Sequence, residues 1–160
     1  MLNFIAFPEN SRIWIYSSDR IISDDKIPYV HNTIQEFTNS WTSHQQGLVA
    51  GGGILHNFFI VLVVNEELNT PGGCSIDKSV HFIQDLGKKL QVDFFNRMMV
   101  HYIQNEEVHV IHLEKISEVL KAGVMNENTL FFNSLVSNKK DFINQWLTPL
   151  KDSWINKFLE

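Results

Sequence analysis

The side chains best suited to chemistry gather in one short segment, residues 72–79, which joins a strand-like run of the sequence to a helix-like run. Gly72 and Gly73 provide a turn, and Ser75 is a residue type that commonly caps the start of a helix. Asp77 would then lie near the positive end of that helix, where a carboxylate is stabilised. In its simplest interpretation, the segment is a capped helix start entered through a Gly-Gly turn.

The same segment could hold an anion. Amide groups of Gly73, Cys74 and Ser75 would face the ligand, with the helix dipole behind them. Lys78 would add positive charge there, whereas Asp77 would reduce it. We therefore expect a non-enzymatic, soluble domain that binds a small anion or a partner protein at this turn.

Two alternatives remain open. A helix N-terminus stabilises a thiolate, so Cys74 could be the nucleophile of a thiol-dependent hydrolase or transferase. Such an enzyme needs a general base, and His44, three residues after Trp41, is the candidate, although nothing in the sequence brings it to Cys74. The other alternative is a structural homodimer in which the turn is buried and inert.

Histidines are the other side chains with chemical potential, and the chain has seven of them. If residues 105–106 form a two-residue turn, His101 and His112 lie on one face of a hairpin as diagonal neighbours. His109 then points to the opposite face. Two histidines without a carboxylate partner fall short of a zinc site, so we predict no metal and no cofactor.

Composition and missing motifs exclude several classes of protein. The sequence contains no phosphate-binding loop of the form G-x-x-x-x-G-K-[ST], no G-x-S-x-G and no G-x-G-x-x-G. Its 18 acidic and 13 basic residues give a net charge of -5, which argues against binding to nucleic acid. The single cysteine excludes an internal disulfide and a cysteine-based zinc cluster.

Length and hydropathy indicate one domain away from the membrane. A chain of 160 residues suits a single domain, residues 1–160, with a substantial core. The longest apolar run, residues 58–64, is far shorter than the roughly 20 residues that a membrane helix needs. The first residues do not have the pattern of a signal peptide, so we expect a cytoplasmic protein, with some aromatic residues available for a homodimer face.

Hydrophobic periodicity predicts alternating strands and helices in the order β-α-β-β-α-β-β-α-β-α. The expected strands are residues 12–17, 48–55, 58–65, 95–103, 108–113 and 129–132, and the expected helices are 27–41, 76–90, 114–122 and one capped by Ser137. The glycine triplet at residues 51–53 suggests a bulge or a place where something approaches the backbone closely. We predict an α+β fold with a mostly antiparallel sheet and helices on one face, with the ferredoxin-like order βαββαβ in its first six elements and a C-terminal β/α extension.

The sequence also resembles a known family. The resemblance is carried by Arg12-x-Trp14-Ile15-Tyr16, by Trp41-x-x-His44 and by Gly73-Cys74-Ser75-Ile76-Asp77-x-Ser79-x-x-Phe82-Ile83. These motifs are similar to those of a family of small Bacteroidetes proteins, and the similarity extends over most of the chain. Members often carry the label "ABC transporter ATPase", which conflicts with the missing phosphate-binding loop. The resemblance implies a bacterial origin and no particular chemistry.

Overall fold

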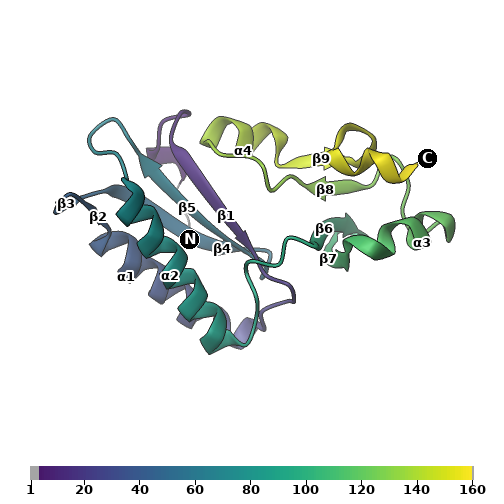
Figure 1. Ribbon diagram of the computed structural model, residues 1–160, viewed down its shortest axis with the longest axis horizontal. Helices are drawn as coiled ribbons and strands as arrows, with labels where there is room; N and C mark the ends of the chain where they lie inside the picture. The colour runs from purple at the N-terminus through teal and green to yellow at the C-terminus, as the bar shows by residue number, and fades with distance from the viewer. Residues whose placement is uncertain (1–3, 160) are drawn as a thin grey trace.

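The structure, a computed structural model, describes residues 4–159 and has an α+β fold built around two antiparallel sheets (Figure 1). The main strands are β1 (Arg12–Ser17), β4 (Val49–Leu55), β5 (Phe59–Asn65), β6 (Met99–Gln104), β7 (Glu107–His112), β8 (Leu130–Phe132) and β9 (Leu147–Pro149). The helices are α1 (Ile27–Ser40), α2 (Gly73–Leu90), α3 (Ile116–Lys121) and α4 (Lys139–Gln145). Shorter elements are the two-residue strands β2 (Thr42–Ser43) and β3 (Gln46–Gly47), and 3-10 turns at Phe4–Ala6, Asp24–Lys26, Leu113–Lys115, Leu150–Asp152 and Trp154–Leu159.

The first sheet has the strand order β1-β5-β4, with β5 antiparallel to both neighbours. Its central strand β5 is the predicted apolar run, and six of its seven residues are buried because both faces of the sheet are covered. The strands expected at residues 48–55 and 58–65 leave only two residues to connect them, and β4 and β5 are indeed joined by a tight turn at His56 and Asn57, which have φ angles of 53° and 60°.

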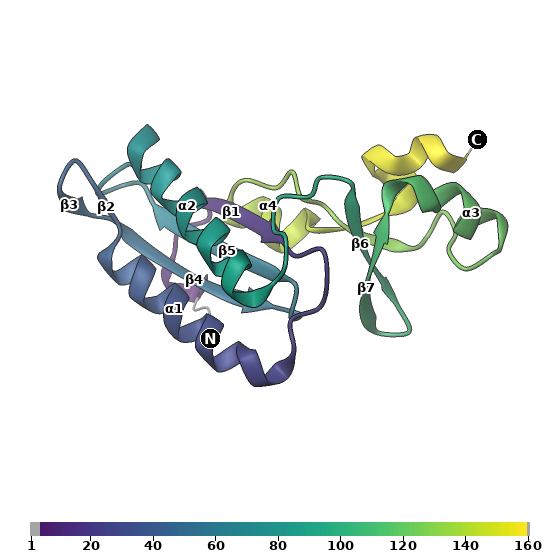
Figure 2. The ribbon, with the colours of Figure 1, turned by 60° about the horizontal axis from the view of Figure 1, so that its bottom comes forward.

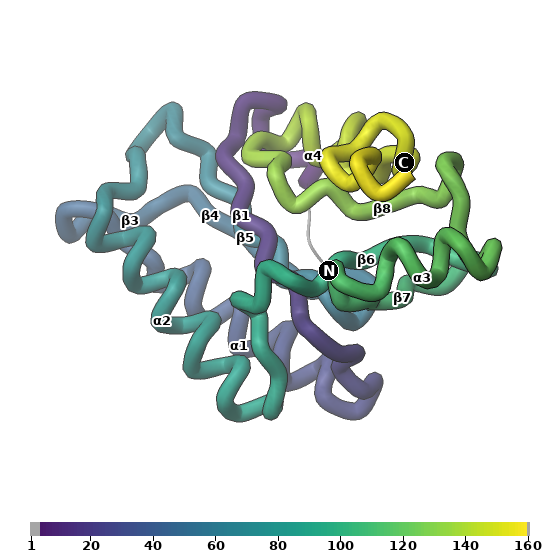
Figure 3. The backbone as a smooth tube through the Cα atoms, turned by 45° about the vertical axis from the view of Figure 1, so that its right-hand side comes forward, coloured from purple at the N-terminus to yellow at the C-terminus, as the bar shows by residue number. Residues whose placement is uncertain are grey.

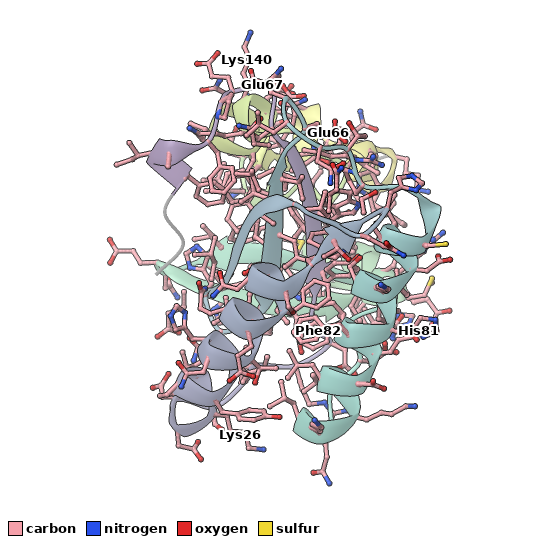
Figure 4. All side chains as sticks on the ribbon, turned by 90° about the vertical axis from the view of Figure 1, so that its left-hand side faces the viewer. Lys26, Glu66, Glu67, His81, Phe82 and Lys140 are labelled. Carbon is pink, nitrogen blue, oxygen red and sulfur yellow. The ribbon has the colours of Figure 1, made fainter. Side chains whose placement is uncertain are left out.

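Helices α1 and α2 lie side by side on one face of this sheet (Figure 2). The predicted stripe on α1 is confirmed, since Val30 and Ile34 are fully buried against the sheet. In the view of Figure 4, Phe82 of α2 points between the two helices, where its ring stacks on Phe37 at a centroid distance of 4.3 Å. His81, its neighbour, points away from this contact (Figure 4).

The glycine triplet marks the close approach that the sequence suggested. A Cβ atom on Gly52 would lie 2.8 Å from Ile34 Cγ2 of α1 and 2.8 Å from a Leu62 methyl group of β5. Only a residue without a side chain allows α1 to pack this closely on β4.

The second sheet has the strand order β7-β6-β8-β9. The predicted placement of His101 and His112 as diagonal neighbours in the hairpin is confirmed, because His101 pairs with Val110 and Met99 with His112. Asn105 and Glu106, with φ angles of 53° and 64°, form the turn. One face of this sheet packs against α3 and the C-terminal 3-10 turns, in a cluster that contains Ile116, Leu150 and Ile155.

The ferredoxin-like expectation is only half right. Strands β1, β5 and β4 have the order and directions of a split βαβ unit. The next strand, β6, should then pair with β1, but it lies between β7 and β8 in the second sheet instead. Both edges of β6 are used there, so none is left for β1. Figure 3 shows the chain running from the end of α2 to β6.

Helices α1 and α2 cover one face of the first sheet, as expected, but this sheet is not open on its other side. The opposite face packs against the second sheet and α4 in an aromatic cluster. Its centre is formed by Phe59, Phe132 and Trp146, whose ring centroids are 4.6 to 5.0 Å apart. The molecule is therefore layered. Helices α1 and α2 cover the first sheet, the first sheet packs on the second sheet, and α3 with the C-terminal 3-10 turns covers the other side of the second sheet.

Helix starts differ from the sequence predictions at two further places. From the sequence, Asp25 is a suitable N-cap for the first helix, but α1 follows a 3-10 turn and has Lys26 at its N-cap. Asn138, not Ser137, caps α4, where its side-chain oxygen accepts the N–H of Asp141 at 2.8 Å. Within residues 4–159, no helix is both long enough and apolar enough to span a bilayer.

Candidate functional site

The structure corrects the role of Ser75 in the segment where the sequence concentrated its chemistry. Helix α2 begins at Gly73, and the extended residue Gly72 is its N-cap. Ser75 therefore lies inside the first turn, is 3% exposed and donates its hydroxyl to the Thr42 carbonyl at 2.8 Å. Asp77 is consequently one turn further from the helix start than the sequence suggested.

A small hairpin, β2 and β3, holds the start of α2 in place. The hydroxyl of Ser43 accepts the N–H of Gly72 at 3.2 Å. The buried indole of Trp41 donates to the Ser75 carbonyl at 2.9 Å. The sequence did not reveal this hairpin, because two-residue strands are too short to give a periodic pattern.

This hairpin also places His44 beside the residue that precedes α2. Its turn contains His44, and the His44 Nε2 lies 3.7 Å from the position of a Cβ built on Gly72. Cys74, two residues further along the chain, is exposed and unpaired with any other sulfur in the structure. The start of α2 is likewise exposed at Gly73, Asp77 and Lys78. The predicted thiol and base candidates thus lie in one region of the surface.

A cavity of about 670 Å³ lies between the two sheets, away from the start of α2. Its walls come from the end of β1, the chain before β6, β6 itself, the chain after β8, and two tryptophans near the C-terminus. The lining residues are Ile15, Tyr16, Ser17, Phe59, Phe94, Phe95, Asn96, Arg97, Met99, Val100, His101, Phe132, Ser134, Leu135, Trp146 and Trp154. Its volume falls within the usual range of small-molecule sites, roughly 300–1,000 Å³.

The cavity occupies the place that a fourth strand would fill beside β1. Near its start, β1 uses its outer edge, since the Ile13 N–H donates to the Ser137 carbonyl at 2.9 Å. Further along, residues 15–17 line the cavity instead of pairing with β6. His101 of β6, a lining residue, connects the second sheet to the residue that follows β1, because its Nε2 hydrogen bonds to the Ser18 carbonyl at 2.7 Å.

His101 is held as a neutral imidazole. Because a carbonyl only accepts, Nε2 must carry the hydrogen in this bond. The rings of Phe58 and Phe59 meet the imidazole edge-on at 5.2 and 4.9 Å. Burial lowers the pKa of His101, and the hydrogen bond to Ser18 opposes this effect only in part. A neutral His101 leaves Nδ1 as a hydrogen-bond acceptor.

Aromatic rings dominate the lining of the cavity. Phe, Tyr and Trp make up 12% of the chain but seven of the sixteen lining residues. Three apolar side chains at the cavity are also open to solvent, with Phe95, Leu135 and Trp154 exposed by 40%, 75% and 44%. Exposed apolar groups around a concave apolar site are typical of a place where a ligand binds.

Two of the lining residues carry polar groups that are themselves buried. The Tyr16 hydroxyl is 3.3 Å from the Ser79 hydroxyl of α2, and burial raises the pKa of this tyrosine. Trp146 is 9% exposed, and its Nε1 has no hydrogen-bond partner among the described residues. No group of three or more His, Cys, Asp or Glu side chains within residues 4–159 is arranged to hold a metal ion.

The sequence does not reveal this cavity. Most of its lining residues are Phe, Trp or aliphatic residues, and such residues have the same pattern whether they fill a core or line a cavity.

Comparison of the chain with protein-family models, curated proteins and solved structures finds no match.

Proposed function

We propose that this protein is a non-enzymatic, cytoplasmic binding protein, and that its ligand is a small, mainly apolar and aromatic molecule held between the two sheets. The observation that carries the proposal is the cavity of about 670 Å³ lined by seven aromatic rings. Aromatic walls favour flat ligands, because rings stack or meet edge to face with an energy beyond that of simple burial.

The polar groups around this cavity suit recognition better than catalysis. The Nε2–H of His101 donates to the Ser18 carbonyl, and this hydrogen bond fixes the orientation of the imidazole ring. The Tyr16 hydroxyl is close to Ser79. No cysteine lines the cavity, and its serines have no histidine hydrogen bonded to them among the bonds of residues 4–159.

The proposal is tested with N-phenyl-1-naphthylamine, an uncharged dye whose fluorescence rises in an apolar site. We expect one dye molecule to bind per chain and to quench the emission of Trp146 and Trp154. Ser134→Trp places a large side chain on an exposed lining residue and should weaken binding by at least about tenfold, which corresponds to 1.4 kcal/mol.

Ser117→Trp is the matched control, since Ser117 is an exposed serine on α3 that does not line this cavity. This variant should bind the dye as the unmodified protein does. Absence of dye binding, or an equal loss in both variants, would show that the cavity is not a binding site.

A thiol-dependent enzyme is the second candidate. The observation that favours it is the position of the His44 ring beside Gly72, two residues before the exposed Cys74. Anion binding by the amides of Gly73, Cys74 and Ser75 and the structural homodimer both stay predictions of the sequence, as does the resemblance to the Bacteroidetes family.

A further inference from the structure

We propose that the ligand of the cavity between the sheets is an organic anion, namely an aromatic carboxylate whose charged group binds at Arg97. This inference rests on the proposed function and adds the chemical class of the ligand. Its first support is the charge of the lining. A chain with 18 acidic residues has none among the sixteen that line this cavity, and Arg97 is the single charged residue among them.

Arg97 is free to bind a ligand. It is exposed, and it belongs to none of the ion pairs found within residues 4–159. A guanidinium binds a carboxylate through two parallel N–H···O bonds, which gives both affinity and orientation. The aromatic lining would then hold the ring of the ligand while Arg97 binds its charged end.

A second cation lies beside the cavity. The Lys157 Nζ lies 5.5 Å from the ring centre of Trp154, a lining residue with 44% exposure. The acid Asp152 lines a smaller neighbouring cavity that shares Val100, Phe132, Leu135 and Trp154 with this one. Because the carboxylate of Asp152 would repel an anion, we place the charged end of the ligand at Arg97 and not toward that smaller cavity.

The outer edge of β1 supplies an additional donor. The N–H of Ile13 points to this edge, because it donates to Ser137 outside the sheet. Backbone groups alternate along a strand, so the N–H of Ile15 points to the same edge, and Ile15 lines the cavity. This amide has no acceptor among the hydrogen bonds of residues 4–159. A carboxylate oxygen is a suitable acceptor for such a donor.

Three probes with one ring system separate the charge from the shape of the ligand. These are naphthalene-2-carboxylate, the neutral naphthalene-2-carboxamide and the cationic 2-naphthylmethylammonium, each titrated calorimetrically into the full chain at neutral pH and low salt. We expect the carboxylate to bind about fivefold more tightly than the carboxamide, as a partly exposed ion pair provides. The preference should disappear at about 1 M salt, where charges are screened within about 3 Å.

Substitutions at Arg97 identify the source of the preference. Arg97→Met should bring the carboxylate down to the affinity of the carboxamide, and Arg97→Glu should make the ammonium probe the preferred one. Arg20→Met is the control, because Arg20 is an exposed arginine beside Asp19 that does not line this cavity, and it should keep the preference for the carboxylate.

Each outcome has a defined meaning. If the carboxylate and carboxamide bind equally well, or if Arg97→Met leaves their ratio unchanged, the anion inference is wrong while the proposed binding function stands. If none of the three probes binds, the proposed function fails together with it.

Discussion

Trp41 shows how one side chain shapes a distant part of the surface. It ends α1, yet its indole donates to the carbonyl of Ser75 in the first turn of α2, 34 residues further along the chain. The hairpin that follows Trp41 carries His44 to the side of Gly72. The proximity of His44 to the start of α2 therefore depends on a contact that sequence spacing does not contain.

Alkylation of Cys74 distinguishes the two candidate functions at this scale. Because Cys74 is exposed, iodoacetamide should modify it in the folded protein without denaturant. If the protein is only a binding protein, His44→Ala should leave the alkylation rate and its pH dependence unchanged. A rate that falls, or a pH dependence that shifts, in His44→Ala would favour the thiol-dependent enzyme instead.

At the scale of elements, sequence patterns predicted the helix and strand positions well. Apolar residues three and four apart predicted the buried face of α1, and the run of apolar residues predicted β5 as a doubly covered strand. Helix starts were less predictable. Ser75 has the type of an N-cap, but its hydroxyl bonds to Thr42, a partner that only the tertiary structure supplies.

The packing of α1 on β4 gives a stability prediction. Gly52→Ala would place a methyl group 2.8 Å from both Ile34 and Leu62, so the helix or the strand must shift. We expect a loss of about 1–3 kcal/mol in the free energy of unfolding, as for other overpacked cores. Gly47→Ala, with no atom within 4 Å of the new methyl group, is the control, and urea denaturation of both variants measures the difference. Equal free energies of unfolding for the two variants would mean that Ile34 and Leu62 can move aside to accommodate the new methyl group at little cost.

At the scale of the whole molecule, the separation of the sheets creates the candidate site. Strand β6 pairs with β7 and β8, and the outer edge of β1 is left to line a cavity. The pairing of β6 with β8 joins residues about thirty positions apart, such as Tyr102 and Phe131, and the order of elements does not specify it.

The contact between the sheets also predicts how stability depends on pH. Because burial lowers the pKa of His101 in the folded state, the unfolded chain binds more protons below the ordinary histidine pKa of about 6.5. The stabilising contribution is complete above about pH 6.5 and is lost as the pH falls below it. The lowered pKa of His56 acts in the same direction.

Urea denaturation between about pH 5.5 and 7.5 measures this effect, which for one group is at most about 1.4 kcal/mol per pH unit. His101→Gln should flatten the dependence, whereas His81→Gln, at an exposed position of α2, should preserve it. A slope that is unaffected by His101→Gln would show that His101 is not the group responsible.

The sequence by itself determined the α+β class, the buried strand β5, the amphipathic α1, the hairpin register of β6 and β7, and the special glycines of β4. These features depend on local periodicity and turn chemistry, which the order of residues specifies directly. Only the tertiary structure decided that β6 joins a second sheet, that His44 lies beside the start of α2, and that aromatic residues such as Phe95 and Trp154 line a cavity rather than fill a core. Those outcomes depend on contacts between distant segments, and many apolar arrangements satisfy the same pattern of residues until the layers are packed together.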